Sequence, residues 1–226
     1  MPRYYKFLGR FGRAVRGGHG IWSLPTDDGP GEWMPEIADP MPCRRGYHAS
    51  TLEHLLHWNG PALFEVEYDG PLLYQYDKVV GGKARLVRRI KAWNHKTVDA
   101  IAAEVCLACI RAMRLDQTGR DAAMKLYRQA LATPRGEPWA DYQQRTRPLE
   151  SPYLTDVDGG WVLRNMILAL GETRRTTSAH GRYGWPEYAR LLQDMHRRLT
   201  LARPKSRLIR AAHETVLLKH LGITHE

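Results

Sequence analysis

Residues 63–68 read Leu-Phe-Glu-Val-Glu-Tyr, and this alternation decides how the first part of the chain folds. The apolar side chains Phe64, Val66 and Tyr68 fall on one face of an extended chain, and the two glutamates between them fall on the other. The turn sequence Asp-Gly-Pro follows directly, and a second apolar run, residues 72–76, comes after it. We therefore predict a β-hairpin with one buried face.

Other segments around this hairpin have the composition of short strands. Residues 83–90 and residues 4–8 are both predicted to be strands. Thr51 is placed to cap a short helix over residues 52–58, which Asn-Gly-Pro would end. Glycine and proline recur between these segments, so residues 1–97 are predicted to form a small β-rich unit.

After Asn94 the spacing of apolar residues changes from two to about 3.6, which is typical of helices. Helices are predicted at residues 98–113, 121–132, 160–170, 186–201 and 204–221, with Gly222 as the final stop. Residues 133–159 contain four prolines and are predicted to form a long loop with a helical turn at 139–144. The fold class predicted is α+β, with a β-rich N-terminal unit packed against a C-terminal unit of about five helices over residues 98–226.

The composition excludes several classes of protein. The chain has 226 residues, of which 43% are hydrophobic and 26% charged, so it is not generally disordered. No apolar run approaches the roughly 20 residues that span a membrane, and the N-terminus lacks the apolar segment of a secretory signal. Three cysteines are too few for a disulfide framework. We expect a cytoplasmic protein with free thiols.

The charge balance favours an anionic partner. Lys and Arg number 34 against 24 Asp and Glu, which gives a net charge of +10. The first functional hypothesis is a binding or accessory protein that engages nucleic acid or another polyanion. An acidic protein partner fits the same charge, so a protein–protein inhibitor or an assembly module is an alternative.

Three groups of arginines are the candidate nucleic-acid-binding residues. The first lies among glycines near the N-terminus, the second on the predicted strand 83–90, and the third where the last two predicted helices meet. They are Arg10, Arg13 and Arg16; Arg85, Arg88 and Arg89; and Arg197, Arg198, Arg207 and Arg210.

The best-defined motif is the segment 43–50, Cys-Arg-Arg-Gly-Tyr-His-Ala-Ser. A strand that ends at a helix start can direct a side chain into a cleft, where helix amides attract an anion. Tyr47, His48 and Ser50 are therefore the candidate ligand-binding residues, with His48 placed to bond a ribose or a phosphate. The opposing interpretation is that His48 is a hydrogen-bonded core residue and that Gly46 only permits a turn.

No pattern in the chain predicts a metal site or assigns a catalytic residue. Cys106 and Cys109 have metal-like spacing, but they share the apolar face of a predicted helix and no second pair accompanies them. His54 and His57 lack an evident third ligand. The sequence leaves open whether the protein is an enzyme.

The segment 43–50 also carries a resemblance. Cys43, the box Gly-Tyr-His-Ala at 46–49, the acidic strand 63–70, the Asp-Lys pair at 77–78 and the strand 83–90 together resemble an uncharacterised family of bacterial and phage-encoded proteins. The resemblance covers about residues 4–93. It implies a phage-related protein and a boundary near residue 97, and it implies no mechanism.

A looser similarity is to ADP-ribosyltransferase-like folds, which hold NAD in a split sheet. Residues 47–50, Tyr-His-Ala-Ser, are similar to the strand that supplies the NAD-binding histidine in one branch of those enzymes. This similarity implies NAD or a related nucleotide as the ligand. Where those enzymes carry a catalytic glutamate, the last predicted strand has Lys83, Arg85 and Arg88. The similarity therefore predicts nucleotide binding more directly than transfer chemistry.

Overall fold

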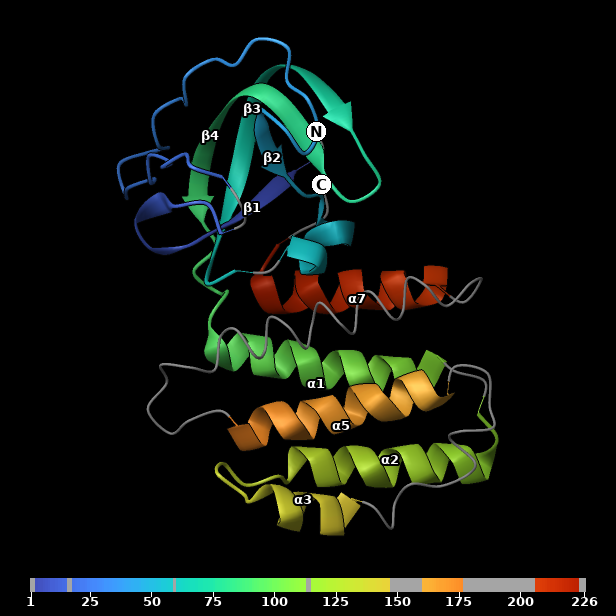
Figure 1. Ribbon diagram of the computed structural model, residues 1–226. Coiled ribbons are helices and arrows are strands. Elements are labelled where there is room, and N and C mark those ends of the chain that lie inside the picture. The colour runs from blue at the N-terminus through green and yellow to red at the C-terminus, as the bar shows by residue number, and fades with distance from the viewer. Residues whose placement is uncertain are drawn as a thin grey trace. The chain divides into compact units, whose positions relative to one another are not determined.

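The computed structural model describes residues 3–15, 18–58, 60–112, 115–146, 160–176 and 206–223 (Figure 1). A curled antiparallel sheet of four strands comes first, and five helices follow in the described part of the chain. The α+β fold class predicted from the sequence is confirmed. The chain divides into two compact units, one of residues 1–94 with 221–226 and the other of residues 95–220.

The four strands are β1 (Tyr4–Leu8), β2 (Tyr47–Ala49), β3 (Ala62–Tyr74) and β4 (Val79–Arg89). They lie in the order β1-β3-β4-β2, and each neighbouring pair is antiparallel. Two backbone hydrogen bonds between Tyr5 and Ser50, of 2.7 and 2.8 Å, bring the end of β2 back to β1. The sheet therefore curls until its two outer strands meet.

The predicted hairpin of residues 63–68 and 72–76 is wrong. Strand β3 runs through Asp69, Gly70 and Pro71 without turning back, and the register against β4 shifts between Asp69 and Leu72. Proline has no N–H to donate, so the extra residues form an irregularity in the strand while β4 keeps pairing on both sides of it. The chain turns later, where the Gln75 N–H donates to the Lys78 carbonyl over 2.9 Å.

The core of this unit confirms the apolar face predicted for residues 63–68. Phe64 and Val66 are buried, and they form one cluster with side chains of β1, β2, β4 and the connection between β1 and β2. Part of that connection, residues 31–37, runs beside β4 and donates from the amides of Gly31, Met34 and Ile37 to its carbonyls, at 2.9 Å each. The connection therefore covers an edge of β4 that β2 is too short to reach.

Two short 3-10 helices complete the unit. One, η1, spans Arg10–Gly12, and the other, η2, spans Leu52–Trp58, where a short helix is predicted. The His54 amide donates to the Thr51 carbonyl over 3.2 Å, which is the three-residue spacing of a 3-10 turn.

The helices of the second unit are α1 (His95–Ala112), α2 (Gln117–Leu131), α3 (Trp139–Thr146), α5 (Gly160–Thr176) and α7 (Ser206–Leu221). Helix α2 starts four residues before its predicted start because the Asp116 carboxylate caps it, accepting from the Gly119 amide over 2.7 Å. Gly222, with φ +62°, follows α7 as predicted. The helix predicted at 186–201 lies outside the described residues. Among the described helices, none combines the length and the apolar character that crossing a membrane requires.

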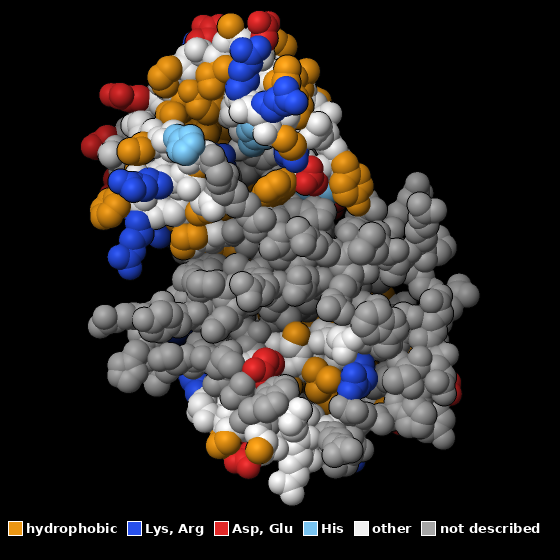
Figure 2. All heavy atoms as spheres, in the orientation of Figure 1, with side chains coloured by type: hydrophobic (Ala, Val, Ile, Leu, Met, Phe, Trp, Pro, Cys, Tyr) orange, Lys and Arg blue, Asp and Glu red, His pale blue; other side chains and the backbone are white. Residues whose placement is uncertain are grey.

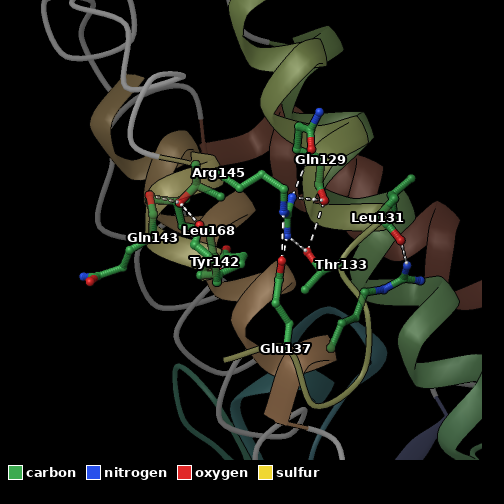
Figure 3. Close-up of polar contacts among 10 residues, drawn as sticks. Gln129, Leu131, Thr133, Glu137, Tyr142, Gln143, Arg145 and Leu168 are labelled. Carbon is green, nitrogen blue, oxygen red and sulfur yellow. Dashed lines mark hydrogen bonds and ion pairs between the residues drawn. The ribbon is translucent and has the colours of Figure 1, made fainter. Parts of the chain in front are cut away.

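Arg145 of α3 ties several parts of the helical unit together (Figure 3). Its guanidinium donates to both carboxylate oxygens of Glu137, at 2.8 and 3.0 Å, and to the Thr133 hydroxyl at 3.0 Å. It also donates to the backbone and side-chain oxygens of Gln129 on α2, at 3.0 Å each. The Tyr142 ring lies 5.4 Å from the guanidinium, and its hydroxyl donates to the Leu168 carbonyl of α5. The N–H groups of Arg145 therefore all bond to other residues of the helical unit.

A second arginine joins three helices. Arg174 of α5 donates to both carboxylate oxygens of Asp99 on α1 and to the Leu131 carbonyl of α2. Lys219 and His220 of α7 both reach the Glu104 carboxylate of α1, at 2.8 and 2.6 Å. Arg174 and Lys219 are thus paired with carboxylates of the same unit.

Candidate functional site

The strand-rich unit contains a cavity of about 950 Å³. Its wall is formed by β1, β2, η2 and the long connection between β1 and β2. Three of the lining side chains are Lys or Arg and one is acidic: Lys6, Arg44, Lys78 and Glu32. Aromatic rings of Trp22, Trp33, Tyr47 and Trp58 also line it. The described wall thus combines positive charge with flat apolar surfaces.

Lys6 occupies the middle of β1 and points toward the inside of the sheet. Its neighbours two residues away, Tyr4 and Leu8, share that face and belong to the core cluster. The ammonium nitrogen Nζ donates to the His48 carbonyl over 2.7 Å and lies 5.1 Å from the centre of the Trp22 ring. None of the ion pairs among the described residues includes Lys6. Burial without a neighbouring carboxylate lowers the pKa of Lys6 to about 8.

Lys78 stands at the same wall in a different environment. Its ammonium bonds the Cys43 sulfur, lies 3.3 Å from an Asp77 carboxylate oxygen and sits 4.9 Å from the centre of the Trp58 ring. Burial alone would lower the pKa of Lys78, but the hydrogen bonds to Cys43 and Asp77 outweigh it and the pKa is raised. Lys78 therefore keeps its positive charge well above neutral pH, whereas Lys6 is mostly protonated at pH 7 and loses its charge near pH 8.

His48 lies on β2 with both ring nitrogens bonded to backbone. Nε2 is 3.0 Å from the Cys43 amide, and Nδ1 is 3.0 Å from the Gly46 carbonyl. Because an amide N–H can only donate, Nε2 must be unprotonated, and the proton on Nδ1 is donated to Gly46. Burial lowers the pKa of His48, and the charges of Lys6 and Lys78 lower it further, although the Gly46 bond opposes them. The ring is neutral and holds the turn at 43–46; its role in binding a ligand stays a prediction.

Tyr47 and Ser50 line the same cavity as His48. The Tyr47 hydroxyl donates to the Pro35 carbonyl over 2.6 Å, and its ring meets the Trp22 ring edge-on at 5.2 Å. Ser50 is buried, and its backbone makes the two bonds to Tyr5 that join β2 to β1. The structure thus brings the three predicted ligand-binding residues together at the cavity wall.

Sequence reasoning missed Lys6 as a residue of this cavity. A usable signal exists for Lys6, which is the one charged residue in the apolar strand Tyr4–Leu8. The position of Trp22 beside β1 depends on how the connection folds, which no local pattern shows. Lys78 belongs to the Asp-Lys pair of the family resemblance, without a role attached to it.

The arginines predicted on β4 are mostly paired. Arg85 bonds Glu67 and Arg88 bonds Glu65, each at 2.7 Å, and these residues are direct partners across β3 and β4. Lys83 bonds Asp69 in the same series at 2.6 Å. Arg89 is exposed at the end of the strand. Because β3 presents a carboxylate at each successive outward position, these basic side chains form a row of ion pairs across the two strands.

Arg10 and Arg13 are exposed on either side of Phe11. Phe11 is 79% exposed and has φ 56°, and within the described ranges no carboxylate lies within 4 Å of either arginine. Arg16, Arg197 and Arg198 lie outside the described residues. Arg207 and Arg210 fall on α7, and their side chains are not described. On the face shown in Figure 2, the coloured basic side chains are dispersed among apolar ones and do not merge into one patch.

The remaining candidate groups have structural surroundings. Cys106 and Cys109 are buried on α1, and burial raises the pKa of both thiols. Within the described part of the chain, no three His, Cys, Asp or Glu side chains are grouped to hold a metal ion.

No protein-family model, curated protein or solved structure matches this chain. Function is therefore inferred from the cavity itself.

Proposed function

We propose that this protein binds a phosphate-bearing ligand of the nucleotide class in the cavity of its strand-rich unit. The observation that carries the proposal is the pair of lysines at one wall of that cavity. Both ammonium groups lie close enough to His48 to disfavour a positive charge on its ring. A phosphate group placed there would meet two cations and the Arg44 guanidinium nearby on the wall.

The size and the lining of the cavity support the same ligand class. Small-molecule sites commonly have volumes of about 300 to 1,000 Å³, and about 950 Å³ has room for a nucleotide. Indole and phenol rings offer flat apolar surface against which a base can pack. The Trp22 ring already lies beside the Lys6 ammonium, so a ligand with an anionic end and an aromatic end would find both partners close together.

Isothermal titration calorimetry with AMP, ATP and NAD tests the proposal, with the corresponding nucleosides as ligands that lack phosphate. We expect saturable binding of the nucleotides, weakened at least tenfold in Lys6→Met and in Lys78→Met. Lys91→Met is the matched control, because Lys91 is exposed on the same unit and does not line the cavity. Equal affinity for nucleosides and nucleotides, or equal loss in the control, would contradict the proposal.

A second candidate is single-stranded nucleic acid, which the turn at residues 10–13 favours. An exposed aromatic ring between two exposed arginines can stack on a base while the arginines contact phosphates. Ala14 and Val15, which follow this turn, line the cavity, so a strand bound at Phe11 would lead toward it.

Fluorescence anisotropy with labelled single- and double-stranded DNA and RNA, between about 50 and 300 mM salt, separates the two candidates. If nucleic acid is the ligand, a single strand binds more tightly than any free nucleotide, and Phe11→Ala or the pair Arg10→Ala, Arg13→Ala weakens it severalfold. Binding seen only at the lowest salt would mean that the net charge of the protein attracts nucleic acid nonspecifically. In that case an acidic protein partner, sought by pull-down, becomes the better explanation of the +10 charge.

A further inference from the structure

The two cavity lysines are suited to different tasks. Lys78 is bonded to Cys43 and Asp77, so its proton is held firmly. Among the described residues, Lys6 makes one hydrogen bond, to the neutral carbonyl of His48, and its ammonium lies over the Trp22 ring. A lysine held among apolar groups with no carboxylate beside it is the usual setting of an amine that acts as a nucleophile.

We propose that Lys6 is a reactive amine that forms an imine with an anionic aldehyde or ketone bound in this cavity. The inference rests on the proposed function, because Lys78 would hold the anionic part of the molecule while its carbonyl carbon meets Lys6. It adds a chemical class to the ligand, namely a carbonyl compound that also carries a phosphate or another anionic group.

The reaction needs no oxidant and no further reactant. The lone pair of the neutral Nζ attacks the carbonyl carbon, a C–N bond forms, and the C=O π electrons move to the oxygen. A proton passes from the nitrogen to that oxygen and gives a carbinolamine. Loss of the hydroxyl with a second proton from nitrogen releases water and leaves the C=N bond. One amine and one carbonyl thus give one imine and one water.

The surroundings of Lys6 also separate it from Lys78 and Lys83. With a pKa of about 8, about one tenth of the Lys6 side chain is neutral at pH 7, whereas a lysine of ordinary pKa is neutral in roughly one part in 3,000. The Asp69 carboxylate raises the pKa of Lys83, and the pKa of Lys78 is raised as well. Near neutral pH, Lys6 therefore holds far more of the nucleophilic form than either of these neighbours.

The competing explanation is that Lys6 only caps the His48 carbonyl. Borohydride trapping distinguishes the two. The full chain is mixed at about neutral pH with a limiting amount of pyridoxal 5′-phosphate, which carries an aldehyde and a phosphate, and in parallel with pyridoxal, which lacks the phosphate. Borohydride then reduces any imine to a stable secondary amine, and peptide mass mapping locates it. Mapping also separates a Lys6 adduct from one on the N-terminal amine.

We expect the Lys6 peptide of the unaltered protein to be labelled at least tenfold faster than the average of the other lysine peptides. We expect pyridoxal to label it more slowly than pyridoxal 5′-phosphate, and Lys78→Met to remove that difference. Lys6→Arg keeps a cation and hydrogen-bond donors on β1 but cannot form the imine, so the other peptides should be labelled as before. Labelling spread evenly over the lysines, or confined to the N-terminal amine, would overturn the inference.

The outcome is separable from that of the proposed function. Nucleotide binding in both the unaltered protein and Lys6→Arg, without a Lys6 adduct, would overturn the inference and leave nucleotide binding in place. Selective labelling of Lys6 by pyridoxal 5′-phosphate in a protein that binds no nucleotide would overturn nucleotide binding and leave the inference about Lys6 in place. The unaltered protein supplies the decisive peptide map, so the test does not depend on how well any variant folds.

Discussion

At the scale of single residues, Lys6 makes folding depend on pH. Its pKa falls from 10.5 to about 8 on folding, so the unfolded chain binds the proton more strongly. Below about pH 8 the folded protein carries the whole cost of a charged Lys6, and this cost disappears as pH rises toward 10.5. The free energy of unfolding should therefore rise with pH across this window because of Lys6, by up to about 3 kcal/mol.

The variant Lys6→Met removes this contribution. Urea unfolding between about pH 7 and 10 should show a variant that is relatively most stable at pH 7 and loses its advantage as pH rises. Lys83→Met is the control of opposite sign, because Asp69 raises the pKa of Lys83 and its removal brings no relief at neutral pH. Parallel pH profiles for Lys6→Met and the unaltered protein would show that Lys6 is hydrated and has an ordinary pKa.

The three cysteines differ sharply in reactivity by their placement. Cys43 is exposed and its sulfur accepts from the Lys78 ammonium, whereas Cys106 and Cys109 are buried on α1. A thiol-disulfide reagent should therefore modify one thiol in the native protein and all three after denaturation. Two or three fast thiols in the native protein would mean that α1 opens readily.

At the scale of elements, the curl of the sheet depends on a glycine in β4. A Cβ atom on Gly81 would lie 2.5 Å from the Tyr68 ring, and Tyr68 donates from its hydroxyl to the Tyr47 carbonyl of β2. Gly81→Ala should therefore push the ring away and lower the free energy of unfolding by about 1–3 kcal/mol. Gly29→Ala is the matched control, since nothing lies within 4 Å of its Cβ position. Chemical denaturation of the two variants measures the difference, and equal stability would mean that the ring moves aside without cost.

The same strands show what local sequence can and cannot predict. The alternation from Phe64 to Tyr68 correctly predicts which face is buried, because that pattern depends only on the geometry of one strand. The turn signal at residues 69–71 misleads, since pairing with the long strand β4 outweighs a local preference for turning. The start of α2 is missed because the cap, Asp116, precedes the apolar pattern by several residues.

At the scale of the whole molecule, the net charge predicts an anionic partner but not where that partner binds. Arg85 and Arg88 pair with carboxylates of β3, and Arg145 and Arg174 pair with carboxylates of the helical unit. The segment 43–50, which its composition singles out, supplies residues that line the cavity. The other residues of the proposed ligand site are at positions 6, 22 and 78, and they come together only in the folded unit. No local pattern contains that long-range arrangement.

The division into two compact units predicts that ligand binding and helical stability can be altered separately. Arg145→Met removes the ion pair with Glu137 and the hydrogen bonds to the Gln129 and Thr133 oxygens. It should lower the free energy of unfolding of the helices by about 2–3 kcal/mol, measured by circular dichroism at 222 nm in rising urea. Arg128→Met, at an exposed position of α2, should change it little.

The nucleotide dissociation constant provides the other half of this prediction. At a temperature where the helices of Arg145→Met remain folded, its affinity should equal that of the unaltered protein, because every residue that lines the cavity lies between positions 5 and 78. A tenfold loss of affinity in Arg145→Met, without loss of helical signal, would mean that the helical unit contributes to the ligand site. The same loss in Lys6→Met alone, with Arg145→Met unaffected, is what a site built wholly within the strand-rich unit requires.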